Sequence, residues 1–128
     1  MPVIHRAQTL DLVDTGARLA ELTAKARSGS LETRDVQGGT FTISNHGVSG
    51  SLVAAPIIIN QPQSAILGIG KLEKRVVVLD REGKDLTAIR PMVYVTLTID
   101  HRVLEGHQAT RFLTRYDETR DARSCRTR

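Results

Sequence analysis

Residues 93–99 are the stretch that most constrains the fold. Their apolar side chains fall at every second position, the pattern of a half-buried β-strand: Val93, Val95, Leu97 and Ile99. The predicted strand ends in Asp100, His101 and Arg102. A packed strand fixes the groups at its tip, so this end is a candidate place for chemistry. On spacing alone, a histidine beside an aspartate at a strand end more often has a structural role.

The length and composition predict one folded domain. The chain has 128 residues, of which 40% are hydrophobic, and its core must be aliphatic because it contains two Phe, two Tyr and no Trp. The single cysteine, Cys125, excludes an internal disulfide and a zinc cluster, which fits a reducing compartment. No apolar segment reaches the roughly 18 residues of a membrane span, and no signal-peptide pattern is present. These features predict a soluble intracellular protein.

The positive charge is concentrated near the C-terminus. The formal net charge is +4, and residues 111–128 contribute +3 of it, from six Arg against Asp117, Glu118 and Asp121. The basic excess therefore describes a tail, and neither a nucleic-acid-binding face nor a membrane partner is predicted.

An amphipathic helix is predicted over residues 10–26. Thr9 can cap its start, and Lys25 and Arg27 followed by Gly29 are typical of its end. We expect one apolar stripe to be buried, formed by Leu12, Gly16, Leu19 and Ala26. Residues 30–37 are polar and predict a short turn.

A strand is predicted over residues 40–44, with Phe41 and Ile43 on one face and the hydroxyls on the other. A sharp turn follows, in which Gly47 and Gly50 can supply positive φ. His46 is interpreted as a loop histidine. The glycines form no phosphate-binding pattern, so no nucleotide site is predicted.

The rest of the chain predicts further strands and a second helix. Residues 52–63 are interrupted by Pro56 and end as a loop, and residues 64–70 and 76–79 are predicted strands. A polar turn hinged at Gly83 leads to the probable hairpin partner, residues 86–90. Residues 107–120 predict a helix whose inner face carries Ala109, Phe112, Leu113 and Tyr116. Residues 121–128 are expected to be a frayed tail. Together these elements indicate a mixed α/β domain with four or five strands.

Four phrases of the sequence resemble one family. Residues 38–45, 60–68, 90–92 and 100–102 are similar, in order, to the catalytic domain of dihydrolipoyl acyltransferases, the core subunits of 2-oxo acid dehydrogenase complexes. The similarity runs from about Pro2 to Thr119. It implies an α/β fold in which helices flank a mixed β-sheet, as in a truncated chloramphenicol acetyltransferase. Residues 1–128 would then be the C-terminal half of the catalytic domain.

The resemblance also implies the site residues. His101 matches the His of the family's His-x-x-x-Asp-Gly motif, the general base that deprotonates a thiol, and Ser44 matches its oxyanion-stabilising Ser. In the family these two residues meet across a subunit boundary of a trimer. Glu105 stands where the motif has Asp. Asn45 and Arg102 are expected to bind substrate.

The substrates and partners follow from the same resemblance. Coenzyme A and a lipoyl group are the expected substrates, the lipoyl group is not attached to this chain, and no metal is expected. The expected partners are further copies, as a homotrimer or a higher assembly of trimers, a thiamine-dependent dehydrogenase component, and a lipoyl or acyl carrier domain. The expected location is the cytoplasm, or the mitochondrial matrix if the source is eukaryotic.

Two interpretations of different classes remain, and a fragment of a longer enzyme is a third. The chain is either an active acyltransferase or a catalytically inactive truncated relative that serves as an oligomeric scaffold for partner enzymes. Retention of His101, Arg102, Ser44 and Asn45 favours the enzyme. Glu105 and the absence of the family domain's N-terminal half favour the scaffold.

Overall fold

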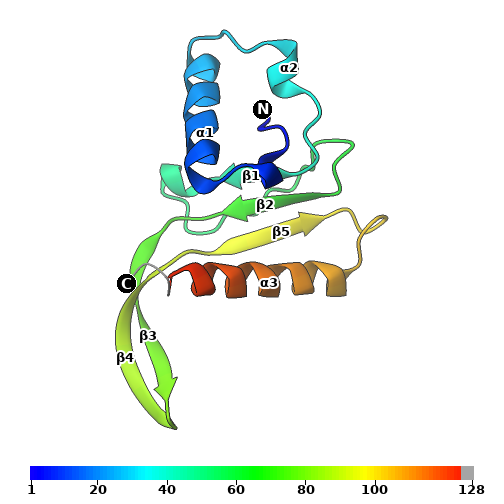
Figure 1. Cartoon of the computed structure of the whole chain (residues 1–128). Helices are drawn as coiled ribbons and strands as arrows, with labels where there is room; N and C mark the ends of the chain where they lie inside the picture. The colour runs from blue at the N-terminus through cyan, green and yellow to red at the C-terminus, as the bar shows by residue number, and fades with distance from the viewer. Residues whose placement is uncertain (125–128) are drawn as a thin grey trace. The chain divides into compact units, whose positions relative to one another are not determined.

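The computed structural model describes the backbone of residues 1–124 and the side chains of residues 1–119. The chain divides into two compact units, Met1–Thr40 and Phe41–Arg128. Figure 1 labels the elements used below. In the described part of the chain, no helix is long and apolar enough to cross a membrane.

The first unit is built on helix α1, Leu12–Arg27, preceded by the short 3-10 helix η1, Ala7–Thr9. The predicted cap was wrong: Asp11, not Thr9, caps α1, and its side chain accepts a hydrogen bond from the backbone N–H of Asp14 at 2.8 Å. A carboxylate at this position also complements the positive end of the helix. The end is as predicted, because Gly29 follows with a φ of +68°.

The predicted buried stripe of α1 is also wrong. Leu12 is 80% exposed and Leu19 is 56% exposed, whereas Leu22 is buried. The buried side faces helix α2, Thr33–Val36, where the sequence predicts only a turn. Glu32 and Asp35 cap each other's backbone N–H groups there, and Lys25 of α1 lies 3.4 Å from the Asp35 carboxylate. Polar contacts therefore select the side of α1 that is covered.

The second unit contains a three-stranded sheet in the order β1-β2-β5 (Figure 1). The strands are β1 (Thr42–Asn45), β2 (Ala65–Ile69) and β5 (Val95–Ile99). The pairing of β1 with β2 is parallel and that of β2 with β5 is antiparallel. The predicted mixed sheet is thus confirmed.

The alternation of β1 is as predicted, and the hydroxyl of Thr42 lies on its buried face. Thr42 is buried, whereas Phe41 is 42% exposed and Ile43 is 59% exposed. The Thr42 hydroxyl donates to the side-chain carbonyl of Gln63, which is also buried, at 2.6 Å. A buried hydroxyl requires such a partner, and Gln63 comes from a distant loop. Alternation within β1 alone could not reveal it.

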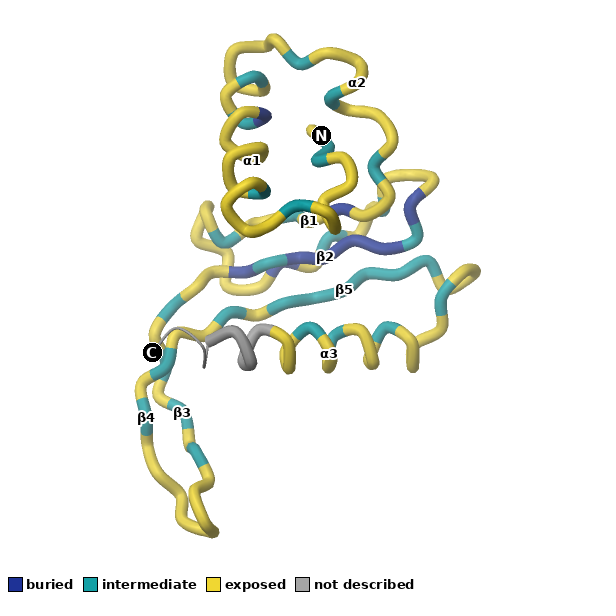
Figure 2. The backbone as a smooth tube through the Cα atoms, in the orientation of Figure 1, coloured by how far each residue is buried: buried dark blue, intermediate teal, exposed yellow. Residues whose placement is uncertain are grey.

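The loop 46–60, which contains the short 3-10 helix η2, Gly47–Ser49, packs along the sheet without forming a strand. The hydroxyls of Thr96 and Thr98 donate to the carbonyls of Ala54 and Pro56, which pins the loop to β5. Residues of this loop and of β2 supply most of the buried apolar side chains, among them Ala54, Ile66 and Leu67. Figure 2 shows β2 as the most buried strand.

Strands β3, Glu73–Arg81, and β4, Lys84–Met92, form the predicted hairpin. Its turn contains Glu82 and Gly83, both with positive φ, which suits the twist of a tight hairpin. The hairpin is mostly exposed (Figure 2). Val76 and Ile89 lie opposite each other on the two strands and are 70% and 68% exposed.

Helix α3, Gly106–Ser124, packs against β5 (Figure 1). Three residues of its predicted inner face are half-buried, Ala109, Leu113 and Tyr116. Phe112 is more exposed but lies against Phe41, with 6.0 Å between ring centroids. The expected tail begins inside α3, and its last four residues, 125–128, lie outside the described residues.

Candidate active site

Strand β1 ends in a turn that carries two of the predicted site residues. The Ser44 hydroxyl lies 2.9 Å from Nε2 of His46. The Asn45 side-chain carbonyl accepts a hydrogen bond from the backbone N–H of Gly47 at 3.0 Å. Asn45 therefore stabilises the turn, and Ser44 has a histidine as its direct neighbour.

Backbone contacts hold this turn rigidly. The His46 N–H donates to the Ile69 carbonyl at 2.9 Å, and the His46 carbonyl accepts from the N–H and the hydroxyl of Ser49. Gly47 sits so close to the Gly70 carbonyl that a Cβ would come within 3.0 Å of it. Gly47 is therefore needed for its small size, and only Gly50 has the predicted positive φ.

The tip of β5 is fixed by an ion pair. The Asp100 carboxylate accepts from the Arg102 guanidinium, with contacts of 2.9 Å to Nε and 2.6 Å to Nη2, and from the Arg102 backbone N–H at 3.0 Å. These bonds lower the pKa of Asp100 to about 2 and raise the pKa of Arg102. The Arg102 guanidinium therefore has a structural contact with Asp100, and its role in substrate binding stays a prediction.

His101 lies between the two partners of this ion pair. Its backbone is held because the Asp100 N–H donates to Ser64 and the Asp100 carbonyl accepts from Val103 and Leu104. The side chain is exposed, and within the described residues its imidazole makes no hydrogen bond. A fixed backbone thus presents a ring whose nitrogens are both available to another molecule.

Glu105 lies directly before α3. Its carbonyl accepts the first hydrogen bonds of the helix, from Gln108 and Ala109, and its N–H donates to the Gln108 side chain at 2.8 Å. Its carboxylate lies 3.2 Å from Nδ1 of His107, with both side chains exposed. The Glu105 carboxylate, at the position of the motif's Asp, is therefore paired with His107.

Within one chain, Ser44 and His101 are far apart. Ser44 is level with Gly68 of β2 and so with Thr96 of β5, whereas His101 follows Ile99 at the far end of β5. Taking about 3.4 Å per residue and about 4.8 Å between strands, Ser44 is roughly 14 Å from Ile99. One chain does not bring the two predicted catalytic residues together.

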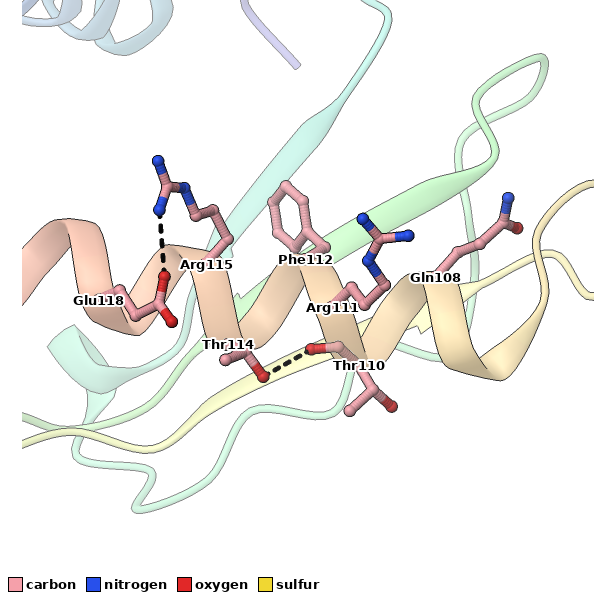
Figure 3. Close-up of a pocket in the computed structure, with 7 residues that line it drawn as sticks. All are labelled: Gln108, Thr110, Arg111, Phe112, Thr114, Arg115 and Glu118. Carbon is pink, nitrogen blue, oxygen red and sulfur yellow. Dashed lines mark hydrogen bonds and ion pairs between the residues drawn. The ribbon is translucent and has the colours of Figure 1, made fainter.

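The described residues also form an open groove of about 650 Å³ along α3 (Figure 3). Its lining comes from this one helix: Gln108, Thr110, Arg111, Phe112, Thr114, Arg115 and Glu118. None of the five predicted site residues lines it. Among residues 1–124, no group of three or more His, Cys, Asp and Glu is arranged to hold a metal ion.

Sequence reasoning missed two contacts of the candidate site. It treated His46 as a loop histidine, although its ring contacts Ser44, and it did not consider His107, which pairs with Glu105. In both pairs the partners are two residues apart. Whether side chains at that spacing meet depends on their rotamers and on the local backbone geometry, which the sequence does not specify.

The sequence model of the family "2-oxoacid dehydrogenases acyltransferase (catalytic domain)" matches residues 1–119. Among individual relatives, the dihydrolipoyllysine-residue succinyltransferase component of the 2-oxoglutarate dehydrogenase complex of Rickettsia bellii is 47% identical over 118 residues. That match covers 92% of this chain and 28% of the relative. The chain thus spans less than a third of this curated relative.

Solved structures agree with the sequence relationship. A dihydrolipoamide acetyltransferase of Azotobacter vinelandii, investigated for the roles of a serine, a histidine and an asparagine in its catalytic mechanism, superposes with a TM-score of 0.82 at 38% identity. The match covers 91% of this chain and 46% of that one. The cubic core of a pyruvate dehydrogenase multienzyme complex gives a TM-score of 0.80 at 39% identity, covering 89% and 45%.

The histidine and asparagine of the Azotobacter protein are four residues apart, the same spacing as His101 and Glu105. The fold, the order of the motifs and the sequence match agree over nearly the whole chain, and they confirm the predicted fold class. The chain belongs to the family of 2-oxo acid dehydrogenase acyltransferase catalytic domains.

Proposed function

We propose that this chain takes part in acyl transfer between the thiol of a lipoyl group and coenzyme A. The observation that carries the proposal is His101, an imidazole without a polar partner among the described residues, held at a strand tip by the Asp100–Arg102 ion pair. An imidazole with a pKa near 6.5 is well matched to a thiol with a pKa near 8.5 at neutral pH.

In the proposed reaction, His101 takes the proton of the attacking thiol. The thiolate forms a bond to the thioester carbonyl carbon, and the carbonyl π electrons move onto oxygen. The hydroxyl of Ser44 donates a hydrogen bond to that oxyanion, a contact typically worth 10²- to 10³-fold in rate. When the intermediate collapses, the carbon–sulfur bond to the departing thiol breaks, and the departing sulfur takes the proton from His101.

The proposed site is shared between copies of the chain. Because Ser44 and His101 lie at opposite ends of the sheet, a copy carrying the base needs a neighbour carrying the oxyanion donor. A heterologous contact repeated around a three-fold axis gives each copy one complete site, which supports a homotrimer. We also propose that these trimers form a higher assembly. The proposed partners are a thiamine-dependent dehydrogenase component and a lipoyl or acyl carrier domain, and the proposed location is the cytoplasm or the mitochondrial matrix.

A scaffold without activity is the second candidate. The carboxylate of Glu105 pairs with His107, so it is directed toward a group other than the proposed base. Such a chain would assemble with its neighbours and organise partner enzymes without transferring an acyl group.

One experiment separates the two. Transfer from acetyl- or succinyl-coenzyme A to dihydrolipoamide is measured for the chain and for His101→Ala, with His5→Ala, in the first unit, as a control. We expect His101→Ala to abolish transfer and His5→Ala to leave it unchanged. Equal rates for the chain and His101→Ala would end the enzyme proposal. The oligomeric state is measured by light scattering. A chain that forms trimers but transfers no acyl group would support the scaffold, and a monomeric chain would contradict both candidates.

A further inference from the structure

The contact between Ser44 and His46 lies inside the proposed site and has no role in the reaction described above. The Ser44 hydroxyl oxygen and His46 Nε2 are 2.9 Å apart, and either atom can be the donor. Two features determine what this contact does: how firmly the imidazole is held, and where the hydroxyl proton goes.

The backbone of His46 is anchored on both sides. Its N–H donates to Ile69 of β2, and its carbonyl accepts two hydrogen bonds from Ser49. Next to it, Gly47 packs against the Gly70 backbone at a distance that admits no side chain. The imidazole is therefore delivered to Ser44 by a backbone with little freedom to move, which is the condition for orienting another group.

The proton balance of Ser44 then limits the possibilities. A serine hydroxyl has one proton to donate and can accept two hydrogen bonds. If His46 Nε2 carries no proton, Ser44 donates to it and has nothing left for an oxyanion. If Nε2 carries a proton, Ser44 accepts from it, and the hydroxyl proton stays available.

We propose that His46 is a positioning residue for acyl transfer, whose Nε2–H donates to Ser44 and thereby directs the Ser44 hydroxyl proton toward the oxyanion. The inference rests on the proposed function and deepens it. Donation from Nε2 also polarises the hydroxyl, which makes Ser44 a stronger donor than a serine alone. His46 acts through Ser44 and does not touch the reacting atoms.

A nucleophilic serine activated by His46 is the alternative chemistry for such a pair. That arrangement needs a third group to orient the base. Within the described residues no partner contacts His46 Nδ1. The geometry therefore fits Ser44 as a hydrogen-bond donor oriented by His46, and the third member of a nucleophilic triad is missing among the described residues.

The kinetic test uses two variants, His46→Leu and His46→Gln, each made in the unmodified chain and in the Ser44→Ala chain. Val48→Ala is the control, because Val48 lies in the same turn and is 87% exposed. We expect His46→Leu to lower kcat about tenfold with little change in KM, as for the loss of one hydrogen bond to the reacting machinery. Gln supplies an amide N–H and should recover most of the loss. In Ser44→Ala, the His46→Leu change should have no further effect.

A further fall in the Ser44→Ala background would overturn the inference, because His46 would then act independently of Ser44. An acyl adduct on Ser44, detected by mass spectrometry after incubation with acetyl-coenzyme A, would also overturn it in favour of the nucleophile.

A second measurement does not depend on activity. The ¹⁵N spectrum of the imidazoles, assigned with His46→Leu, should show His46 with a protonated Nε2 whose resonance shifts in Ser44→Ala, while the His5 resonances stay unchanged. An unprotonated Nε2 would overturn the inference even in an active chain. A protonated Nε2 with no transfer by the unmodified chain would overturn the proposed function, leaving the hydrogen bond itself established.

Discussion

Ser44 and His101 are carried by strands on the two sides of β2 and lie toward opposite ends of the sheet. Their separation is fixed by backbone pairing, because shifting either residue would require a change of strand register. The geometry of one chain therefore determines how the proposed site can be assembled.

The first prediction concerns that assembly. Alone, Ser44→Ala chains should keep about a hundredth to a thousandth of the unmodified transfer rate and His101→Ala chains should show none, since each lacks one member of every site. When the two are unfolded together and refolded as an equal mixture, random assembly should give about a quarter of the unmodified transfer rate, because one site in four then combines an intact His101 with an intact Ser44. A mixture no more active than its components would show that the site does not lie between copies.

The second prediction concerns Glu105. Its carboxylate is one methylene longer than that of aspartate and lies against His107. Misplacement by about 1 Å can cost on the order of a hundredfold in rate, so Glu105→Asp should raise kcat for transfer at least severalfold. His107→Ala, which removes the present partner without shortening the side chain, is the matched variant and should change kcat less. A fall in kcat for Glu105→Asp would show that the longer side chain is adapted to its position.

The third prediction is a pH dependence of stability. Hydrogen bonds from Arg102 lower the pKa of Asp100 from 3.8 to about 2, so the folded chain keeps this carboxylate charged at lower pH than the unfolded chain does. The stabilisation is complete above about pH 4 and is lost as the pH falls from about 3.8 toward 2. Asp100→Asn should therefore have a lower Tm than the unmodified chain at pH 5, and the difference should shrink by pH 2.

Thermal unfolding followed by circular dichroism checks this dependence. The pKa values of Asp35 and Glu73 are also lowered, by the Glu32 backbone N–H and by Arg75 respectively. Those two groups titrate in both chains and cancel in the difference. A difference in Tm that is constant from pH 5 to pH 2 would contradict the role of Asp100.

The fourth prediction compares two glycines. A Cβ at Gly47 would press on the Gly70 backbone, whereas a Cβ at Gly16 in α1 would meet nothing within 4 Å. Gly47→Ala should lower the free energy of unfolding by about 2 kcal/mol, the usual effect of overpacking. Gly16→Ala should raise it by about 0.5–1 kcal/mol through helix propensity. Denaturant titration measures both, and a neutral Gly47→Ala would show that the turn can shift.

Local patterns were sufficient for much of the fold. Alternation over residues 93–99 and the turn at Gly83 predicted β5 and the β3–β4 hairpin, because a strand and a tight turn depend on neighbouring residues. The buried face of α1 was wrong, and the partner of Thr42 in β1 was not predicted, because each depends on a distant polar residue. Lys25 needs Asp35, and Thr42 needs Gln63.

The candidate site shows the same division. The motif match predicts Ser44 and His101 as site residues, but a motif carries no information on which side chains meet. The contacts of Ser44 with His46 and of Glu105 with His107 depend on rotamers within turns. The separation of roughly 14 Å between Ser44 and Ile99 follows only from strand order and direction, which no single stretch of sequence specifies.

The central position of β2 determines the order in which the second unit should open. Only β2 is hydrogen bonded on both sides within the three-stranded sheet, and it holds buried residues such as Ile66 and Leu67. Its amide protons should exchange with solvent only on complete unfolding, whereas those on the outer edges of β1 and β5 should exchange through smaller openings. Ser44 lies in β1 and His101 in the turn after β5, so both predicted catalytic residues would lose their positions while β2 and its buried side chains still protect their amides.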